Sequence, residues 1–314
     1  MPPKIVCVAG ATACGKTALG VLLAKKFNGE VVSADSMQIY RGMSVGTAAP
    51  TAEEMDGVPH YMIAVADPGE QWSAARYAEA AAAVVEDILR RGRLPILVGG
   101  TGLWMDAVIS GRSFAPGSAG GEIRRALQEQ LERQGIEPLL AELERVDPAA
   151  AARLHPADEK RILRALEVYR ETGRTITAHN EETKNLPPRY DAVWIGLCFS
   201  RREDQNALID RRVDAMVSAG LLAEVKALLQ SGLPRDATAM QAIGSKEFAG
   251  VLEGTKTEAE AVAEVKLRSR QYAKRQMTWL RRNPGIHWIS WEKERDFPRA
   301  LQISTEILTA AGVS

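Results

Sequence analysis

The clearest chemical pattern is near the start of the chain, where residues 10–17 read G-A-T-A-C-G-K-T. This is the G-x-x-x-x-G-K-T spacing of a P-loop, whose backbone N–H groups face an anion at the start of a helix. Lys16 adds a charge for the terminal phosphates, and the Thr17 hydroxyl is placed to hold Mg²⁺. The apolar residues 5–8 and 18–24 predict the strand and helix that flank such a loop. The candidate diphosphate-binding residues are therefore Gly10, Ala11, Thr12, Ala13, Cys14, Gly15, Lys16 and Thr17.

A carboxylate, Asp35, follows a second predicted strand at residues 30–33. Three roles suit this position: a ligand of Mg²⁺, a general base facing the same pocket, and a helix N-cap or turn residue. A third strand, residues 95–98, runs into the glycine loop G-G-T-G at residues 99–102. Ligands of open α/β sheets bind at this carboxyl edge. The site is equipped to hold pyrophosphate, with no obvious machinery for cutting a phosphoanhydride.

Residues 266–282 carry seven Lys and Arg residues and no acidic residue. A run of charges is usually a solvated helix face. In a chain with 40 basic and 40 acidic residues, however, this acid-free span favours contact with phosphate or an RNA backbone. Tyr272 and Trp279 on the same helix are expected to be core-facing anchors rather than base-stacking platforms.

Strands alternate with helices in the first part of the chain, which predicts an α/β fold with a parallel, doubly wound sheet. Residues 122–173 show only helical patterns, which predicts an all-helical insertion. We expect a core of residues 1–114, the insertion at 115–190, and a second core segment at 191–314. In the second segment the pattern predicts strands at 192–197 and 286–290. It also predicts helices at 202–219, 221–230, 241–252 and 257–282, and a closing helix from Pro298.

The composition is that of an ordinary globular protein, with 46% hydrophobic and 25% charged residues. The three cysteines are far apart and include no C-x-x-C pair, so neither a zinc site nor a disulfide framework is expected. No apolar stretch reaches membrane-spanning length, and no signal peptide precedes the first strand. We expect a monomeric cytoplasmic protein with no membrane partner.

Six motifs together resemble the bacterial tRNA dimethylallyltransferases, a family of isopentenyltransferases, over residues 5–279. D-S-M-Q-I-Y-R-G at residues 35–42 and R-Q-Y-A-K-R-Q at 270–276 are the most specific. The others are the P-loop, G-G-T-G-L at 99–103, R-I-L-R-A-L-E-V-Y at 161–169 and Q-A-I-G at 241–244. The resemblance implies a P-loop NTPase-like core. It also implies transfer of a dimethylallyl group from dimethylallyl diphosphate to N6 of the adenosine immediately 3′ of the anticodon in tRNA.

The resemblance also assigns roles to individual residues. It implies that Asp35 and Thr101 are catalytic, that Arg212 lies near the diphosphate, and that Mg²⁺ is bound at Thr17. It implies tRNA contacts by the residues after the second strand, by Thr101 and by the helical insertion. These are Asp35, Ser36, Met37, Gln38, Thr101, Arg124, Lys160, Arg161, Ile162, Leu163 and Arg164.

Three other functions remain compatible with a P-loop. One is prenylation of free AMP or ATP, against which the long insertion and the basic helix argue. Another is a small-molecule kinase, which would bind ATP and transfer its phosphate. The last is a non-catalytic RNA-binding protein switched by a nucleotide.

Overall fold

The computed structural model describes residues 2–111, 114–115, 121–184 and 186–313, which fall into two compact units. Unit 1 comprises Met1–Ile109 and Arg189–Ser314, and unit 2 comprises Ser110–Pro188. The boundaries expected from the sequence, at 114/115 and 190/191, lie close to these limits. Each unit has its own hydrophobic core.

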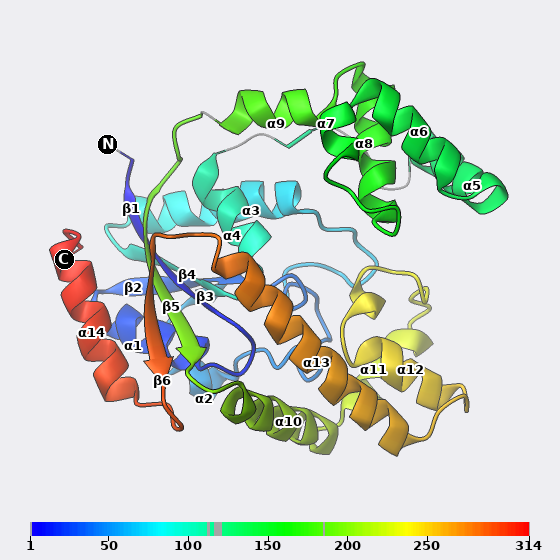
Figure 1. Cartoon of the computed structure of the whole chain (residues 1–314). Helices are drawn as coiled ribbons and strands as arrows, with labels where there is room; N and C mark the ends of the chain where they lie inside the picture. Colours follow the sequence, from blue (N-terminus) through cyan, green and yellow to red (C-terminus); the bar gives the residue numbers. More distant parts are fainter. Residues whose placement is uncertain (1, 112–113, 116–120, 185, 314) are drawn as a thin grey trace. The chain divides into compact units, whose positions relative to one another are not determined.

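Unit 1 is built on a six-stranded sheet with the order β3-β2-β4-β1-β5-β6, in which every paired strand is parallel (Figure 1). The strands are β1 (Lys4–Gly10), β2 (Gly29–Ala34), β3 (His60–Tyr61), β4 (Leu94–Gly99), β5 (Asp191–Phe199) and β6 (Ile286–Trp291). The central strand β1 is buried on both faces, as interior strands of parallel sheets are. The predicted α/β class and parallel sheet are confirmed.

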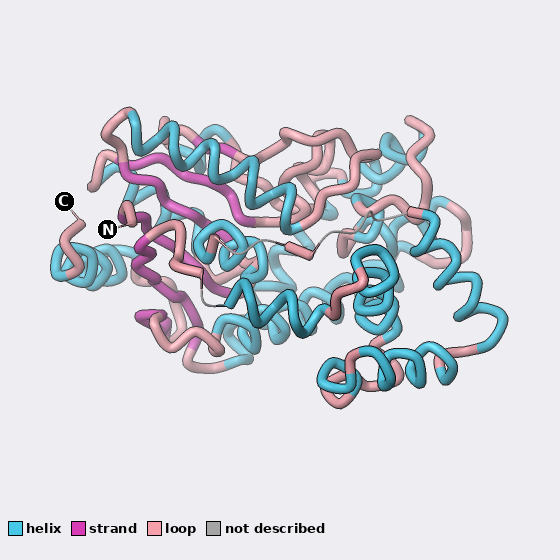
Figure 2. Tube along the Cα trace, turned by 90° about the horizontal axis from the view of Figure 1, so that it is seen from above, coloured by secondary structure: helices cyan, strands magenta, loops and turns pink. Residues whose placement is uncertain are grey.

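Helices cover both faces of this sheet, so the strands form the middle layer of unit 1 (Figure 2, strands magenta, helices cyan). Val6 and Val8 of β1 pack with α1 and α14, whereas Ile5 and Cys7 face the larger core on the other side. The helices of unit 1 are α1 (Lys16–Lys26), α2 (Ala52–Met55), α3 (Ala74–Arg90), α4 (Gly102–Ser110), α10 (Arg202–Ser218), α11 (Leu221–Gln230), α12 (Ser245–Leu252), α13 (Glu258–Leu280) and α14 (Phe297–Ala310).

The helix predicted at residues 241–252 is wrong at its start. A 3₁₀ turn, Ala239–Gln241, is followed by Gly244 at φ 105°, and α12 begins only at Ser245. This left-handed backbone favours glycine and interrupts a helix. The sequence prediction also omits α2, α4 and α9.

Every secondary-structure element in the described part of unit 2 is a helix. Its helices are α5 (Glu122–Gln134), α6 (Glu137–Val146), α7 (Pro148–Ala151), α8 (Glu159–Thr172) and α9 (Ile176–Lys184). The buried carboxylate of Asp147 organises two of them, because Oδ1 accepts from the Ala150 N–H of α7 and Oδ2 from the Thr177 N–H of α9. None of the described helices in either unit is both long and apolar enough to cross a membrane.

Candidate active site

The P-loop residues 10–17 run from the last residue of β1 to the first turn of α1, so the eight candidate diphosphate-binding residues form one continuous segment. Gly15 precedes α1 with φ 91°, and a Cβ there would lie 2.9 Å from the Phe297 ring. Lys16 Nζ donates to the Ala11 carbonyl at 2.8 Å, so the lysine charge lies against the loop. The loop thus places backbone N–H groups and a cation together at the start of a helix, where an anion is stabilised.

Side chains from three distant parts of unit 1 hold the P-loop, and one of them is Gln205 of α10, which donates to the Thr12 carbonyl at 3.3 Å. Gln276 of α13 accepts from the Thr12 N–H at 2.9 Å and donates to the Gly100 carbonyl at 3.1 Å. The Trp291 indole at the end of β6 donates to the Cys14 carbonyl at 2.9 Å. Burial raises the pKa of the Cys14 thiol, which is therefore a packed, protonated group. The loop is pre-positioned by contacts that its own sequence does not reveal.

Asp35 lies at the carboxyl edge of β2, beside the edge of β4. Its Oδ1 accepts from the Met37 N–H at 2.9 Å and from the Gln38 N–H at 3.4 Å, which is the predicted turn role. No hydrogen bond within the described residues uses Oδ2. Thr101 Oγ1 accepts from the Ser36 N–H at 3.2 Å, so the hydroxyl is fixed behind the Asp35 turn. One carboxylate oxygen is therefore structural, and the other is available to a ligand.

A cavity of about 320 Å³ brings these parts together. Its wall includes Thr12, Lys16 and Thr17 of the P-loop together with Asp35 and the turn residues Ser36, Met37 and Gln38. The Gln38 side chain is already engaged, because its Oε1 accepts from the Ser33 hydroxyl at 3.0 Å. An anion cradle and an accessible carboxylate oxygen thus share one cavity.

Arg212 of α10 supplies a second cation to this cavity. Its guanidinium donates to the carbonyls of Thr47 and Ala48 at 3.3 Å, and no carboxylate of the described residues lies within ion-pair distance. Burial lowers the pKa of Arg212, and the negative charges of Asp35 and Glu54 oppose that shift. A half-buried cation whose hydrogen-bond partners are neutral carbonyls favours an anionic ligand.

The donors in the cavity would suit a Mg²⁺ ion bound together with a phosphate ligand. Thr17 lines the cavity next to Lys16. Among the described residues, no group of three or more His, Cys, Asp or Glu side chains could hold a metal ion. Mg²⁺ keeps several waters and is commonly bound by few protein ligands together with substrate phosphates. The Thr17 hydroxyl with diphosphate oxygens and water is such a set.

Comparison with known proteins agrees with this geometry. The sequence pattern of the IPP transferase family matches residues 38–283. A tRNA dimethylallyltransferase of Halalkalibacterium halodurans is 45% identical over 289 residues, covering 92% of this chain and 91% of that protein.

The chain belongs to the IPP transferase family.

Two solved structures extend this comparison to the fold. The tRNA isopentenylpyrophosphate transferase of Bacillus halodurans superposes with a TM-score of 0.73 at 42% identity, covering 98% of this chain and 96% of that one. A eukaryotic dimethylallyltransferase acting on tRNA superposes with a TM-score of 0.84 at 30% identity, covering 98% and 80%. The fold of this IPP transferase is therefore the fold of solved members of the family.

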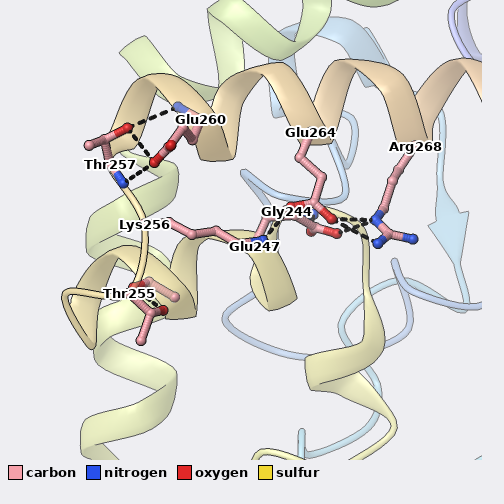
Figure 3. A network of polar contacts seen from close by, with 9 residues as sticks. Gly244, Glu247, Thr255, Lys256, Thr257, Glu260, Glu264 and Arg268 are labelled. Atoms are coloured by element: carbon pink, nitrogen blue, oxygen red, sulfur yellow. Dashed lines mark hydrogen bonds and ion pairs between the residues drawn. The ribbon is translucent and has the colours of Figure 1, made fainter.

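Helix α13 carries most of the basic residues of the span 266–282. Its cations are not all free, as the sequence of this span had indicated. Arg270 donates to both oxygens of Asp210 at 2.6 and 2.8 Å, and Lys266 pairs with Asp214 at 2.6 Å. Arg268 pairs with Glu264 and Glu247, in a network that includes Lys256 (Figure 3). The acids come from the preceding turn of α13 and from α10 and α12. Lys274, Arg275 and the two arginines after the helix remain exposed.

The tRNA-contact candidates of the insertion lie in unit 2 and differ in exposure. Lys160 and Arg161 are exposed, whereas the side chains of Ile162 and Leu163 are buried in the core of unit 2 and cannot reach a ligand. Arg164 donates to the buried Glu167 at 2.8 Å and to the Ala115 carbonyl at 2.7 Å. Arg124 lies 4.0 Å from the same Glu167 carboxylate. These two arginines hold an internal carboxylate as well as forming part of the unit's surface.

His60, Tyr272 and Gln276 are among the residues of the cavity wall to which the sequence analysis assigned no site role. Burial lowers the pKa of His60, and its Nδ1 lies 2.8 Å from the Val58 carbonyl. Tyr272, expected to face the core, is half-buried at the cavity instead. Both Tyr272 and Gln276 belong to the R-Q-Y-A-K-R-Q motif. The uncharged polar residues of this motif could have indicated these two positions as part of the site.

Proposed function

We propose that this protein transfers a dimethylallyl group from dimethylallyl diphosphate to N6 of the adenosine immediately 3′ of the anticodon in tRNA, releasing diphosphate. The observation that carries the proposal is the single cavity shared by the P-loop, the half-buried Arg212 and the Asp35 carboxylate. The family supports the same reaction, because its members above are named for transfer of this group to tRNA.

In this reaction the adenine N6 forms a bond to the first carbon of the dimethylallyl group, and the bond from that carbon to the diphosphate oxygen breaks. The P-loop N–H groups, Lys16 and Arg212 stabilise the negative charge that develops on the departing diphosphate. Asp35 Oδ2 accepts the proton that N6 loses, because Oδ1 is occupied by the turn. Mg²⁺, when bound with Thr17, would neutralise further diphosphate charge.

The acceptor adenine must leave its stack to enter the cavity. Extrusion costs a few kcal/mol and is easiest for an unpaired base, as in an anticodon loop. We assign the backbone contacts that accompany it to the exposed cations of α13 and to Arg124, Lys160, Arg161 and Arg164 of unit 2. We further propose that the enzyme acts as a monomer in the cytoplasm; its three unpaired cysteines suit a reducing compartment.

The test is mass spectrometry of nucleosides from unmodified tRNA carrying A-A-A next to its anticodon. The tRNA is incubated with the protein, Mg²⁺ and dimethylallyl diphosphate. A new N6-dimethylallyladenosine is expected, and it should be lost with Asp35→Ala and with Thr101→Ala. Folded protein that yields none contradicts the proposal. Comparable turnover of free AMP would indicate a nucleotide prenyltransferase, and phosphate transfer from labelled ATP to a metabolite would indicate a kinase.

A further inference from the structure

Tyr272 projects from α13 into the wall of the active-site cavity, which Asp35 also lines. The Arg275 guanidinium lies 5.7 Å from the centroid of its ring, one turn further along the helix. The ring is therefore held between its own helix and the cavity. This position brings a phenol hydroxyl to the part of the cavity that contains the proposed proton acceptor.

The surroundings of the hydroxyl define what it can offer to a ligand. The side chains of Thr101 and Gln276 are polar neighbours of the hydroxyl. Gln276 Nε2 donates one proton to the Gly100 carbonyl and has a second to give, and a threonine hydroxyl can also donate. A phenol oxygen that accepts a hydrogen bond from one of these neighbours keeps its own proton for an acceptor in the cavity. Burial, reinforced by the charge of Asp35, raises the pKa of Tyr272 to about 12, so the phenol remains a donor at neutral pH.

The cavity thus combines an acceptor, Asp35 Oδ2, with a donor, the Tyr272 hydroxyl. Adenine has the complementary pattern, because its N6 amine donates and a ring nitrogen on either side, N1 or N7, accepts. Guanine carries an acceptor oxygen in place of that amine and would meet the carboxylate unfavourably. We propose, on the basis of the function proposed above, that Tyr272 determines base specificity by donating a hydrogen bond to the adenine ring nitrogen beside the reacting amine.

The experiment is a double-mutant cycle between one enzyme atom and one substrate atom. Wild-type protein and Tyr272→Phe are assayed for kcat/KM on anticodon stem-loops with adenosine, 1-deazaadenosine or 7-deazaadenosine at the target position. Phenylalanine keeps the ring and removes only the hydroxyl. The matched control is Tyr61→Phe, since the Tyr61 hydroxyl donates to Glu30 at 2.9 Å and Tyr61 is not among the residues that line the cavity.

We expect Tyr272→Phe to lower kcat/KM for the adenosine stem-loop about fivefold to tenfold, the effect of one neutral hydrogen bond, with KM for dimethylallyl diphosphate unchanged. One of the two deaza analogues should lower kcat/KM of the wild type by a similar factor. For Tyr272→Phe, the same analogue should give the same kcat/KM as adenosine. If the hydroxyl had a purely structural role, the decreases in kcat/KM caused by the substitution and by the analogue would multiply. Multiplicative losses with both analogues, or a raised KM for dimethylallyl diphosphate, overturn the inference. A wild type inactive on adenosine itself would contradict the proposed function as well.

Discussion

Replacing Gln276 by leucine should loosen the active site, because this side chain ties the P-loop to the glycine loop after β4. The variant keeps the size of the side chain but leaves the Thr12 N–H and the Gly100 carbonyl without the partners they have at 2.9 and 3.1 Å. Gln276 is only 5% exposed, so water cannot readily replace it. An unpaired buried polar group costs about 1–3 kcal/mol, and two such groups should lower the free energy of unfolding by roughly 2–6 kcal/mol.

Thermal unfolding measures this loss directly. For a domain of the size of unit 1, roughly 2–4 °C of Tm is lost per kcal/mol, so a decrease of about 4–24 °C is expected. The KM for dimethylallyl diphosphate should rise in parallel, because the P-loop loses one of its supports. The control is Gln271→Leu, which makes the same change at an exposed position of α13. If both variants melt within about 1 °C of wild type, Gln276 does not support the loop in the way described.

Three further outcomes are expected. Arg212→Met should raise KM for dimethylallyl diphosphate about 10- to 100-fold, the effect of a lost charge-assisted hydrogen bond, whereas Arg211→Met on the exposed side of α10 should not. Burial lowers the pKa of His60 below 6.5, so at decreasing pH the unfolded chain binds a proton at this residue before the folded chain does. The free energy of unfolding, measured by urea denaturation, should therefore fall as pH decreases from about 7 to 5. His60→Gln should reduce this fall, and His287→Gln, at an exposed position, should not. Trp291→Phe should lower the free energy of unfolding by about 1–3 kcal/mol, seen in the same denaturation assay, because it leaves a buried P-loop carbonyl unpaired.

Local patterns predicted the sheet and the P-loop well. Runs of buried apolar residues mark β1, β4 and β5, and the glycine–lysine spacing marks the turn into α1. Asp35 was also located correctly, but its turn and ligand roles could not be separated from the sequence. In the structure the two roles are compatible, because they use different carboxylate oxygens.

Features that depend on distant partners could not be predicted. Residues 266–282 include no acidic residue, yet Asp210 and Asp214 of α10 neutralise two of the cations in this span, Arg270 and Lys266. The glycine-rich residues 99–102 indicated a loop, and the sequence analysis therefore missed that α4 begins at Gly102. They serve instead for close packing, since a Cβ on Gly100 would lie 2.1 Å from the Gln276 amide. The short helix α9 is mostly polar, and its Thr175 cap, which accepts from the Ala178 N–H at 3.1 Å, was the only local signal for it.

The central claim is that the P-loop holds the leaving group of a carbon-transfer reaction. The most direct test uses dimethylallyl diphosphate labelled with oxygen-18 at the oxygen that bridges carbon and phosphorus, with unmodified tRNA as acceptor. We expect the label to be recovered entirely in the released diphosphate and the prenylated adenosine to contain none, because the carbon–oxygen bond breaks. Label recovered in dimethylallyl alcohol, with the diphosphoryl group transferred to the acceptor, would mean that the phosphorus–oxygen bond breaks and would contradict this mechanism.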